Sequence, residues 1–427
     1  MSEPLNTGAP LATLRHPATI RLRCNAITQA VADGRSSFFE LDRSRLADAA
    51  ERVAALTLQR FPTLAIPFHS RWRHFEAGGL DRRAELQAAL PGASAAELAR
   101  AQFDLTVVSV LLDAGAGPDW RYTERLPSGE AGQTFVRSEG LGVASFRGFL
   151  AGAFATDPDA PARADAAALQ KLDAAALRAL FQASPSNPMV GLEGRAGLLV
   201  RLGAALADEA RRGGGEARPG LLFDRLTAGG RSSVAAAEVL AEVLRVLSPV
   251  WRSGSVVQSL PAGDVWPHRF AGAASPFVDG GDDGIDRATP GFVPFHKLSQ
   301  WLTYSLLEPL QWAGLQVTGL DALTGLPEYR NGGLLLDSGV LRVRQPALLA
   351  KRWTPGDEFI IEWRALTVSL LDELATAVRQ RLGLTAEQLP LACVLEGGTW
   401  AAGRQIAAEL RPGGGPPLQI DSDGTVF

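Results

Sequence analysis

Amphipathic helical periodicity dominates this amino-acid sequence. Apolar residues recur every three or four positions in alanine- and arginine-rich segments, at 44–60, 95–112 and 160–181. That spacing places the apolar side chains on one face of an α-helix. Asp42 and Ser94 stand before two of these segments, where a short side-chain oxygen can accept a free N–H of the first helical turn. The sequence therefore predicts mainly helical structure.

Strand signals are fewer and shorter than helix signals. Apolar runs of strand length occur at 18–22, 340–343 and 391–395, and an Asp-Gly pair within 421–424 predicts a terminal hairpin. The expected fold class is mainly α with small β elements.

The length of 427 residues exceeds the usual size of one hydrophobic core, so we expect a large two-lobed helical body. The glycine-rich run RRGGGEARPG at 211–220 disfavours both helix and strand. It divides the chain into an N-terminal helical lobe, 1–212, and a C-terminal lobe, 219–427, although one continuous domain is the alternative.

Composition excludes several classes of protein. The formal net charge of -4 provides no basic surface for a nucleic-acid polymer. The N-terminus resembles no secretory signal, and no apolar run is long enough to span a membrane, so a cytoplasmic protein is expected. The two cysteines, Cys24 and Cys393, indicate neither disulfides nor a zinc site. No cofactor or metal is expected, and the oligomeric state stays open.

The segment FHKLSQWLTYSLLEPL at 295–310 combines a core face with a polar stripe. Lys297, Trp301, Tyr304 and Glu308 follow one another at spacings of four, three and four, which places them on one side of a helix. This stripe suits the wall of a pocket, but a solvated helix face is the alternative.

Carboxylates beside arginines mark the next two segments. GLPEYRNGG at 325–333 compresses Glu328, Arg330 and Asn331 into a turn, where they form either a structural ion pair or part of a site. Glu362 lies in the apolar run FIIEWRAL and needs a partner if it is buried. Arg364 belongs to the same run.

Other polar residues stand beside glycines or aromatic residues. The apolar run 391–395 leads into Glu396, two glycines and Trp400, and residues that follow a strand often border pockets. Asp264, Trp266 and His268 in PAGDVWPHR join the candidate substrate-binding residues. The remaining polar positions, which we leave unassigned, are Asp113, Asp119, Trp120 and Glu139.

Five runs carry a resemblance: LLDAGAGPDWRY, SEGLG, LPAGDVWPH, PFHKLSQWLTYSLLEPL and LPEYRNGGLLLDSGV. They resemble a uracil-catabolism protein family of fungi and bacteria, first described as a domain of unknown function, over nearly the whole chain. The resemblance implies a role in a pathway that opens the ring of a uracil ribonucleotide and passes through ribosylurea-type intermediates.

The C-terminal half is also similar to queuosine-salvage N-glycosidases, which have a DNA-glycosylase-like helical fold. The matching positions are Lys297, the Glu328–Arg330 turn, the Glu362–Ala365 helix and Trp400. Glu328 stands where that family has an aspartate. This similarity implies a DNA-glycosylase-like fold in the C-terminal lobe.

The resemblances imply an N-glycosidase that releases urea from a ribosylurea-like nucleoside or nucleotide, which would be its small-molecule partner. Glu328 would stabilise the oxocarbenium charge and direct water at C1. Glu362 or Glu396 would protonate the leaving nitrogen. Lys297 and Arg330 would orient Glu328 or a ribose phosphate.

The remaining candidate substrate-binding residues complete this hypothesis, with Trp301 and Trp400 as pocket walls. These residues are Asn331, Trp301, Tyr304, Arg364, Glu396, Trp400, Asp264, Trp266 and His268.

Two other hypotheses stay open. One is a non-catalytic protein that binds an intermediate or a partner enzyme, with Lys297 and Glu328 as an interior ion pair. The other is a metal-dependent amidohydrolase that uses His268 and the acidic run at 279–286.

Overall fold

A computed structural model describes residues 9–125, 131–251, 254–257, 259–272 and 289–421. Helices make up most of this part of the chain, and strands occur only in pairs, which confirms the predicted mainly α fold with small β elements. The helices are α1 (Ala9–Arg15), α2 (Pro17–Ala32), α3 (Leu46–Arg60), α4 (Trp72–Phe75), α5 (Arg82–Ala88), α6 (Ala95–Leu111), α7 (Arg137–Leu150), α8 (Ala166–Leu169), α9 (Ala174–Leu180), α10 (Leu192–Gly213), α11 (Leu221–Leu226), α12 (Ala236–Leu247), α13 (Lys297–Trp312), α14 (Tyr329–Asp337), α15 (Glu358–Leu382), α16 (Leu391–Val394) and α17 (Trp400–Leu410).

The described residues form six strand pairs, three of which join distant parts of the sequence. The antiparallel pairs are β1 (Phe39–Leu41) with β10 (Leu341–Val343), β2 (Tyr122–Arg125) with β3 (Ala131–Phe135), β5 (Val256–Val257) with β6 (Leu260–Pro261), and β7 (Val265–Pro267) with β8 (Phe292–Pro294). The parallel pairs are β4 (Ser233–Ala235) with β9 (Gln316–Thr318) and β11 (Arg352–Trp353) with β12 (Gln419–Ile420).

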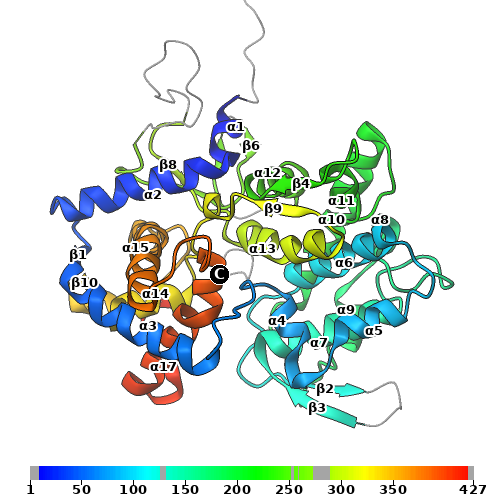
Figure 1. Cartoon of the computed structure of the whole chain (residues 1–427), viewed down its shortest axis with the longest axis horizontal. Coiled ribbons are helices and arrows are strands. Elements are labelled where there is room, and N and C mark those ends of the chain that lie inside the picture. The colour runs from blue at the N-terminus through cyan, green and yellow to red at the C-terminus, as the bar shows by residue number, and fades with distance from the viewer. Residues whose placement is uncertain (1–8, 126–130, 252–253, 258, 273–288, 422–427) are drawn as a thin grey trace, which may run out of the picture.

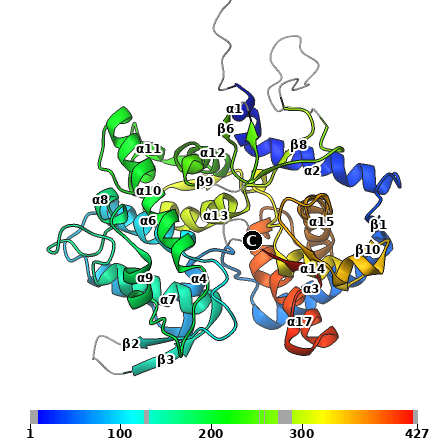
Figure 2. The same cartoon turned by 180° about the vertical axis from the view of Figure 1, so that it is seen from behind.

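The helices form two groups (Figure 1). One group contains α2, α3, α14, α15 and α17, so the N-terminal helices pack with C-terminal ones. The other contains α4 to α12, against which α13 packs through α6 and α12. Figure 2 shows the same division from behind. One hydrophobic cluster continues through both groups, and the 212/219 lobe boundary stays a prediction.

Helix α15 is the centre of the first group. Sixteen of its 25 residues are buried, on every side of the helix, as expected for a helix that is covered all round. Helices α2, α3 and α14 pack against it. This packing fixes the C-terminal elements that carry candidate site residues.

Three local predictions have clear outcomes. The helices expected at 44–60 and 95–112 are confirmed as α3 and α6, and Ser94 accepts the N–H of Glu97 at 3.2 Å as an N-cap. The strand at 340–343 is confirmed as β10. The segment at 160–181 contains the short helices α8 and α9 rather than one long helix.

Two predicted strands are wrong. Residues 18–22 lie in α2, which begins at Pro17 and is capped by the His16 ring, an N-terminus that favours helix. Residues 391–394 form α16, after Pro390, and the chain continues as a π-helical turn at Leu395–Thr399. The hairpin expected at 421–424 falls, beyond Asp421, outside the described residues.

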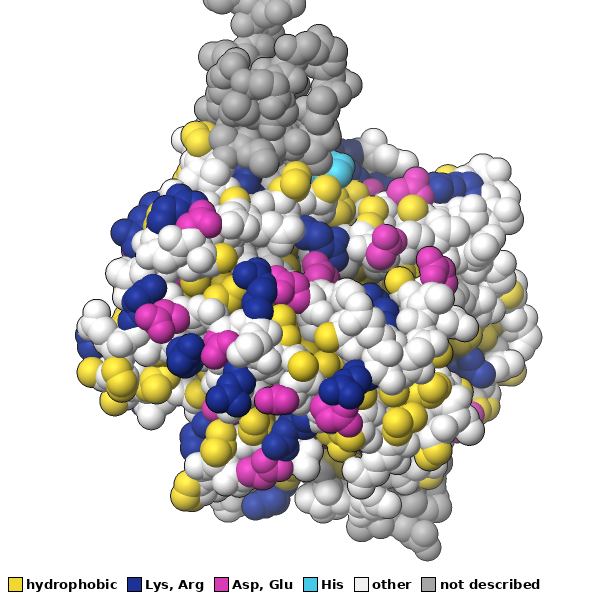
Figure 3. Space-filling model, turned by 60° about the vertical axis from the view of Figure 1, so that its left-hand side comes forward, with side chains coloured by type: hydrophobic (Ala, Val, Ile, Leu, Met, Phe, Trp, Pro, Cys, Tyr) yellow, Lys and Arg dark blue, Asp and Glu magenta, His cyan; other side chains and the backbone are white. Residues whose placement is uncertain are grey.

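The surface carries charges of both signs. Figure 3 shows Lys and Arg side chains interspersed with Asp and Glu over the face in view. Within the described ranges, none of the helices combines the length and apolarity needed to cross a bilayer.

Candidate active site

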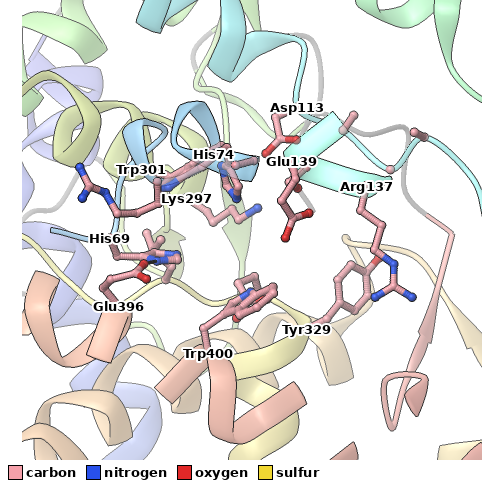
Figure 4. Close-up of a pocket in the computed structure, with 18 of the residues that line it drawn as sticks. His69, His74, Asp113, Arg137, Glu139, Lys297, Trp301, Tyr329, Glu396 and Trp400 are labelled. Carbon is pink, nitrogen blue, oxygen red and sulfur yellow. Dashed lines mark hydrogen bonds and ion pairs between the residues drawn. The ribbon is translucent and has the colours of Figure 1, made fainter. Parts of the chain in front are cut away.

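A cavity of about 910 Å³ opens where the two helix groups meet. Its walls come from α4, α7, α10 and α13 on one side and from α14 and α17 on the other. Figure 4 shows the charged and aromatic side chains that project into it. Such a volume holds a nucleoside-sized molecule.

Glu328 lies in the cavity wall and caps helix α14. Its Oε1 accepts the N–H of Asn331 at 2.6 Å, and its Oε2 accepts the N–H of Arg330 at 2.8 Å. Burial raises the pKa of this carboxyl above its usual value, although the two backbone N–H groups and the charge of Lys297 act in the opposite direction. The side chain is therefore both a structural cap and a carboxyl with an unusual tendency to hold a proton.

Lys297 begins α13 and extends its ammonium into the same cavity. No hydrogen bond or ion pair to this ammonium occurs within the described part of the chain. Burial lowers its pKa, while the nearby charges of Glu328 and Asp113 raise it. His296, just before it, adopts a left-handed backbone with φ of 46°, a conformation that is costly for a non-glycine residue. An ammonium without a partner in a cavity is available to a ligand.

Glu396 is held by two basic side chains. His69 Nδ1 lies 2.9 Å from its Oε2, and Arg60 donates to its Oε1 at 3.0 Å. Burial acts to raise the pKa of Glu396, but the hydrogen bond from His69 and the charge of Arg60 outweigh it, so the pKa is lowered. Glu396 therefore stays ionised and orients the His69 ring at the cavity wall.

Asp113 and Glu139 bring two more carboxylates to the cavity. Asp113 pairs with buried Arg71 at 3.1 Å through Oδ2, and only 8% of its side chain is exposed. Its Oδ1 has no hydrogen-bond partner. Glu139, in the first turn of α7, makes no hydrogen bond or ion pair to any residue that the structure describes. The negative charges of both act on Arg71.

Aromatic side chains line the rest of the space. Trp301 packs edge-on to His74, with ring centroids 5.8 Å apart. Burial and the charge of Arg71 lower the pKa of His74 to about 3, so its ring is neutral at pH 7. Trp400 and Tyr329 lie on the opposite wall (Figure 4). Flat rings of this kind can cover a planar group of a ligand.

Close contact between α14 and α17 fixes that opposite wall. A Cβ added at Gly403 would lie 2.0 Å from the carbonyl oxygen of Arg330. The two helices approach this closely only because residue 403 has no side chain. Glu328 at the start of α14 and Trp400 at the start of α17 are consequently held at fixed positions.

Comparison with known proteins gives the family. The model of a family described as "Protein of unknown function (DUF1688)" matches residues 13–427. The chain belongs to the DUF1688 family. It is 38% identical to "Protein urg3" of Schizosaccharomyces pombe over 417 residues, 96% of each chain. It is 37% identical to "Uracil catabolism protein 4" of Lachancea kluyveri over 423 residues, 92% of this chain and 93% of that protein.

Five of the site residues expected from the sequence of this DUF1688 protein line one cavity. They are Lys297, Trp301, Glu328, Glu396 and Trp400. The structure places the other expected residues behind the cavity wall or away from it.

Asp264 and Arg364 form a buried ion pair beneath Lys297. Arg364 donates to the two carboxylate oxygens of Asp264 at 2.8 and 2.7 Å, and Trp266 donates to it at 2.6 Å. Asp264 also accepts the backbone N–H of Lys297 at 3.1 Å. This pair anchors the start of α13 rather than lining the cavity.

Glu362 and His268 form a second buried pair. Glu362 is fully buried, its Oε1 accepts the Ser36 hydroxyl, and its Oε2 lies 3.3 Å from His268 Nε2. Neither residue lines the cavity. Glu362 thus has a hydrogen-bond partner in Ser36 and lies outside the site.

The last three expected residues make structural hydrogen bonds. Tyr304 is buried, and its hydroxyl donates to the carbonyl of Thr324 at 3.0 Å. Arg330 donates to the carbonyl of Gly414 at 2.9 Å, and the Asn331 amide donates to the carbonyl of Leu326 at 3.1 Å. They hold α13 and α14 in place.

Several cavity residues of this DUF1688 protein are not among the predicted site residues. Among them are Arg60, His69, His74 and Arg137. His69 and His74 belong to the polar-aromatic run HSRWRHF, which is their only signal in the sequence. Arg137 has a left-handed φ of 53°, a strained backbone that places its side chain at the cavity.

Of the unassigned polar residues, Asp113 and Glu139 line the cavity. Trp120 is instead a core residue whose Nε1 donates to the carbonyl of Phe181 at 2.9 Å, and Asp119 is exposed.

The described residues contain no group of three His, Cys, Asp or Glu side chains arranged to hold a metal ion. The acidic run at 279–286 lies outside the described residues.

Proposed function

We propose that this DUF1688 protein is an N-glycosidase of uracil catabolism that hydrolyses a ribosylurea-like nucleoside or nucleotide to urea and ribose or its phosphate. The name "Uracil catabolism protein 4" of a relative that aligns over nearly the full length supports the pathway. The reaction class rests on the resemblance to queuosine-salvage N-glycosidases that we expect from the sequence of the Lys297, Glu328 and Trp400 segments.

The observation that carries the proposal is the position of Glu328. Its carboxyl lines a nucleoside-sized cavity, its pKa is raised by burial, and the Lys297 ammonium is near enough to act on that pKa. Cleavage of the C1–N bond develops positive charge on the sugar, which a carboxylate stabilises. Glu328 also accepts a proton from the water that adds to C1, a role favoured by a raised pKa.

The leaving urea nitrogen needs a proton as the C1–N electron pair moves onto it. Glu396 is poorly suited to donate that proton because its pKa is lowered. His69 takes this role: it donates a proton to the nitrogen, while the ionised Glu396 stabilises the imidazolium through Nδ1. Net addition of water gives urea and the free sugar, and the proton that Glu328 accepted returns to His69 through solvent.

Two substrates and two variants test this proposal. The protein is incubated with ribosylurea and with its 5′-phosphate, and urea and reducing sugar are assayed together. Wild type should release both products in equal amounts from at least one substrate. Glu328→Gln, which retains an oxygen to cap α14, should lose at least about 100-fold in rate.

Two results would contradict parts of the proposal. If wild type releases nothing from either compound, the hydrolase is excluded, and tight binding without release would favour a non-catalytic binding protein. If release occurs and Glu328→Gln retains most of the rate, the hydrolase stands but the role of Glu328 is wrong.

A further inference from the structure

We infer that Glu139, Asp113 and Lys297 form a subsite for two adjacent hydroxyl groups of the substrate sugar. This inference rests on the proposed N-glycosidase function and assigns the sugar to one end of the cavity. Figure 4 shows the three side chains gathered at that end, facing Trp400 and Tyr329 across the space.

The first argument is that these three groups lack protein partners that would fully satisfy them. The Glu139 carboxylate and the Lys297 ammonium have no hydrogen-bond or ion-pair partner among the residues described. Only 8% of the Asp113 side chain is exposed, and its Oδ1 has no hydrogen-bond partner. Buried polar groups are nearly always hydrogen-bonded, so the orphaned Asp113 oxygen indicates a place that a ligand completes, and the partly exposed Glu139 and Lys297 side chains are free to join it.

The second argument is that the Asp113 carboxylate and the backbone of the other two residues are held in place. Arg71 holds Asp113 through Oδ2, and Asp264 holds the backbone of Lys297. Helix α7, which carries Glu139, packs so closely on α4 that a Cβ at Gly142 would lie 2.9 Å from the Cβ of His74. The three residues are therefore brought to one place before the ligand arrives.

The third argument is chemical complementarity. A hydroxyl group is both donor and acceptor, so it can donate to a carboxylate and accept from an ammonium. Two neighbouring hydroxyl groups therefore match two carboxylates with one ammonium between them. A phosphate matches this subsite poorly, because Asp113, Glu139 and Glu328 repel it and Lys297 is the one cation among the three subsite residues. The planar urea group is left for the aromatic wall.

The test measures binding to an inactive protein, so that it does not depend on turnover. In the Glu328→Gln protein, calorimetry compares ribosylurea with 2-deoxyribosylurea, which lacks one of the adjacent hydroxyl groups. We expect the deoxy compound to bind about 10- to 100-fold more weakly, because a hydrogen bond to a charged group is left unmade. Adding Glu139→Gln or Asp113→Asn should reduce this preference to less than about threefold.

The control is Glu193→Gln. Glu193 is also in the first turn of a helix, α10, but it is exposed and lies outside the cavity lining. This variant removes the same charge and should keep the full preference for ribosylurea. A folding defect would weaken both ligands alike and would leave their ratio unchanged.

Equal affinity for the two compounds in the parent protein would overturn the subsite, as would a preference that survives both Glu139→Gln and Asp113→Asn. Absence of binding by both would overturn it as well. Urea release by wild type is measured separately and shows whether the proposed hydrolase fails too. If wild type releases urea but the Glu328→Gln protein binds both compounds equally, only the subsite is wrong.

Discussion

The ion pair of Asp264 with Arg364 gives the clearest test of how this site is supported. Arg364 is fully buried, and only 12% of the Asp264 side chain is exposed. Arg364, Trp266 and the backbone of Lys297 together donate four hydrogen bonds to the carboxylate. Asp264→Ala removes the carboxylate and leaves a buried guanidinium without its counter-charge.

Removing one partner of a buried pair costs about 3–5 kcal/mol, which is a large share of the roughly 5–15 kcal/mol that stabilises a typical protein. We expect Asp264→Ala to lower the free energy of unfolding, measured by urea denaturation and far-UV circular dichroism, by about that amount. The matched control is Glu409→Ala, which breaks the exposed pair with Arg52 and should cost less than about 1 kcal/mol.

The pKa of Asp264 makes a second check possible. Burial acts to raise it, but Arg364 and Trp266 outweigh burial and hold it below the usual value. A lowered carboxyl pKa contributes stability above the unfolded pKa of about 4, and that stability is lost as pH falls through the folded value. The difference between wild type and Asp264→Ala should therefore shrink below pH 4. A loss under 1 kcal/mol at pH 7 would refute the anchoring role.

Three further predictions concern the cavity. Gly403→Ala should destabilise the protein by about 1–3 kcal/mol and reduce urea release, because its Cβ would meet the carbonyl of Arg330, whereas Gly415→Ala, with open space around it, should be neutral in the same denaturation assay. His74 has a folded pKa of about 3 against 6.5, so the unfolded state binds more protons between these values and His74 makes stability rise with pH there. Its share of the slope, at most about 1.4 kcal/mol per pH unit, should be missing in His74→Asn, which should have a shallower slope than wild type. His69→Ala should reduce urea release by about 10²- to 10⁴-fold at pH 7 in the coupled urea assay, and an unchanged rate would exclude His69 as the acid.

The fold class could be predicted from sequence because helical periodicity is a local signal. The 3.6-residue repeat and the Ser94 cap act within one turn of the chain, and α3 and α6 appear where they predict. The strand prediction at 391–395 is wrong because five apolar residues fit a buried strand or a buried helix equally well. The π-helical turn that follows α16 packs Gly397 and Gly398 closely against Thr57, a contact that no local pattern encodes.

The candidate site also could be predicted only in part from the sequence. Resemblance and spacing predict five residues that lie around one cavity: Lys297, Trp301, Glu328, Glu396 and Trp400. Asp264 and Glu362 carry the same chemistry in the sequence, but buried partners 100 and 326 residues away occupy their carboxylates. Only tertiary structure distinguishes a carboxylate that faces a ligand from one that faces an arginine or a serine. The partnership of His69 with Glu396, 327 residues apart, was hidden for the same reason.

The arrangement of the cavity assigns different tasks to the two helix groups. Glu328 and Trp400 come from the group built on α15, whereas Glu139 and Asp113 belong to α7 and the loop after α6 in the other group. Lys297 is near enough to both sides for the charges of Glu328 and Asp113 to act on its pKa. If Glu328 acts at C1 and the other carboxylates hold the sugar hydroxyl groups, a shift of one group relative to the other would move the sugar away from the catalytic carboxyl. The Asp264–Arg364 anchor beneath Lys297 opposes such a shift, because Asp264 binds both the first residue of α13 and Arg364 of α15. This is a reason for a chain to keep a costly buried ion pair beside its cavity.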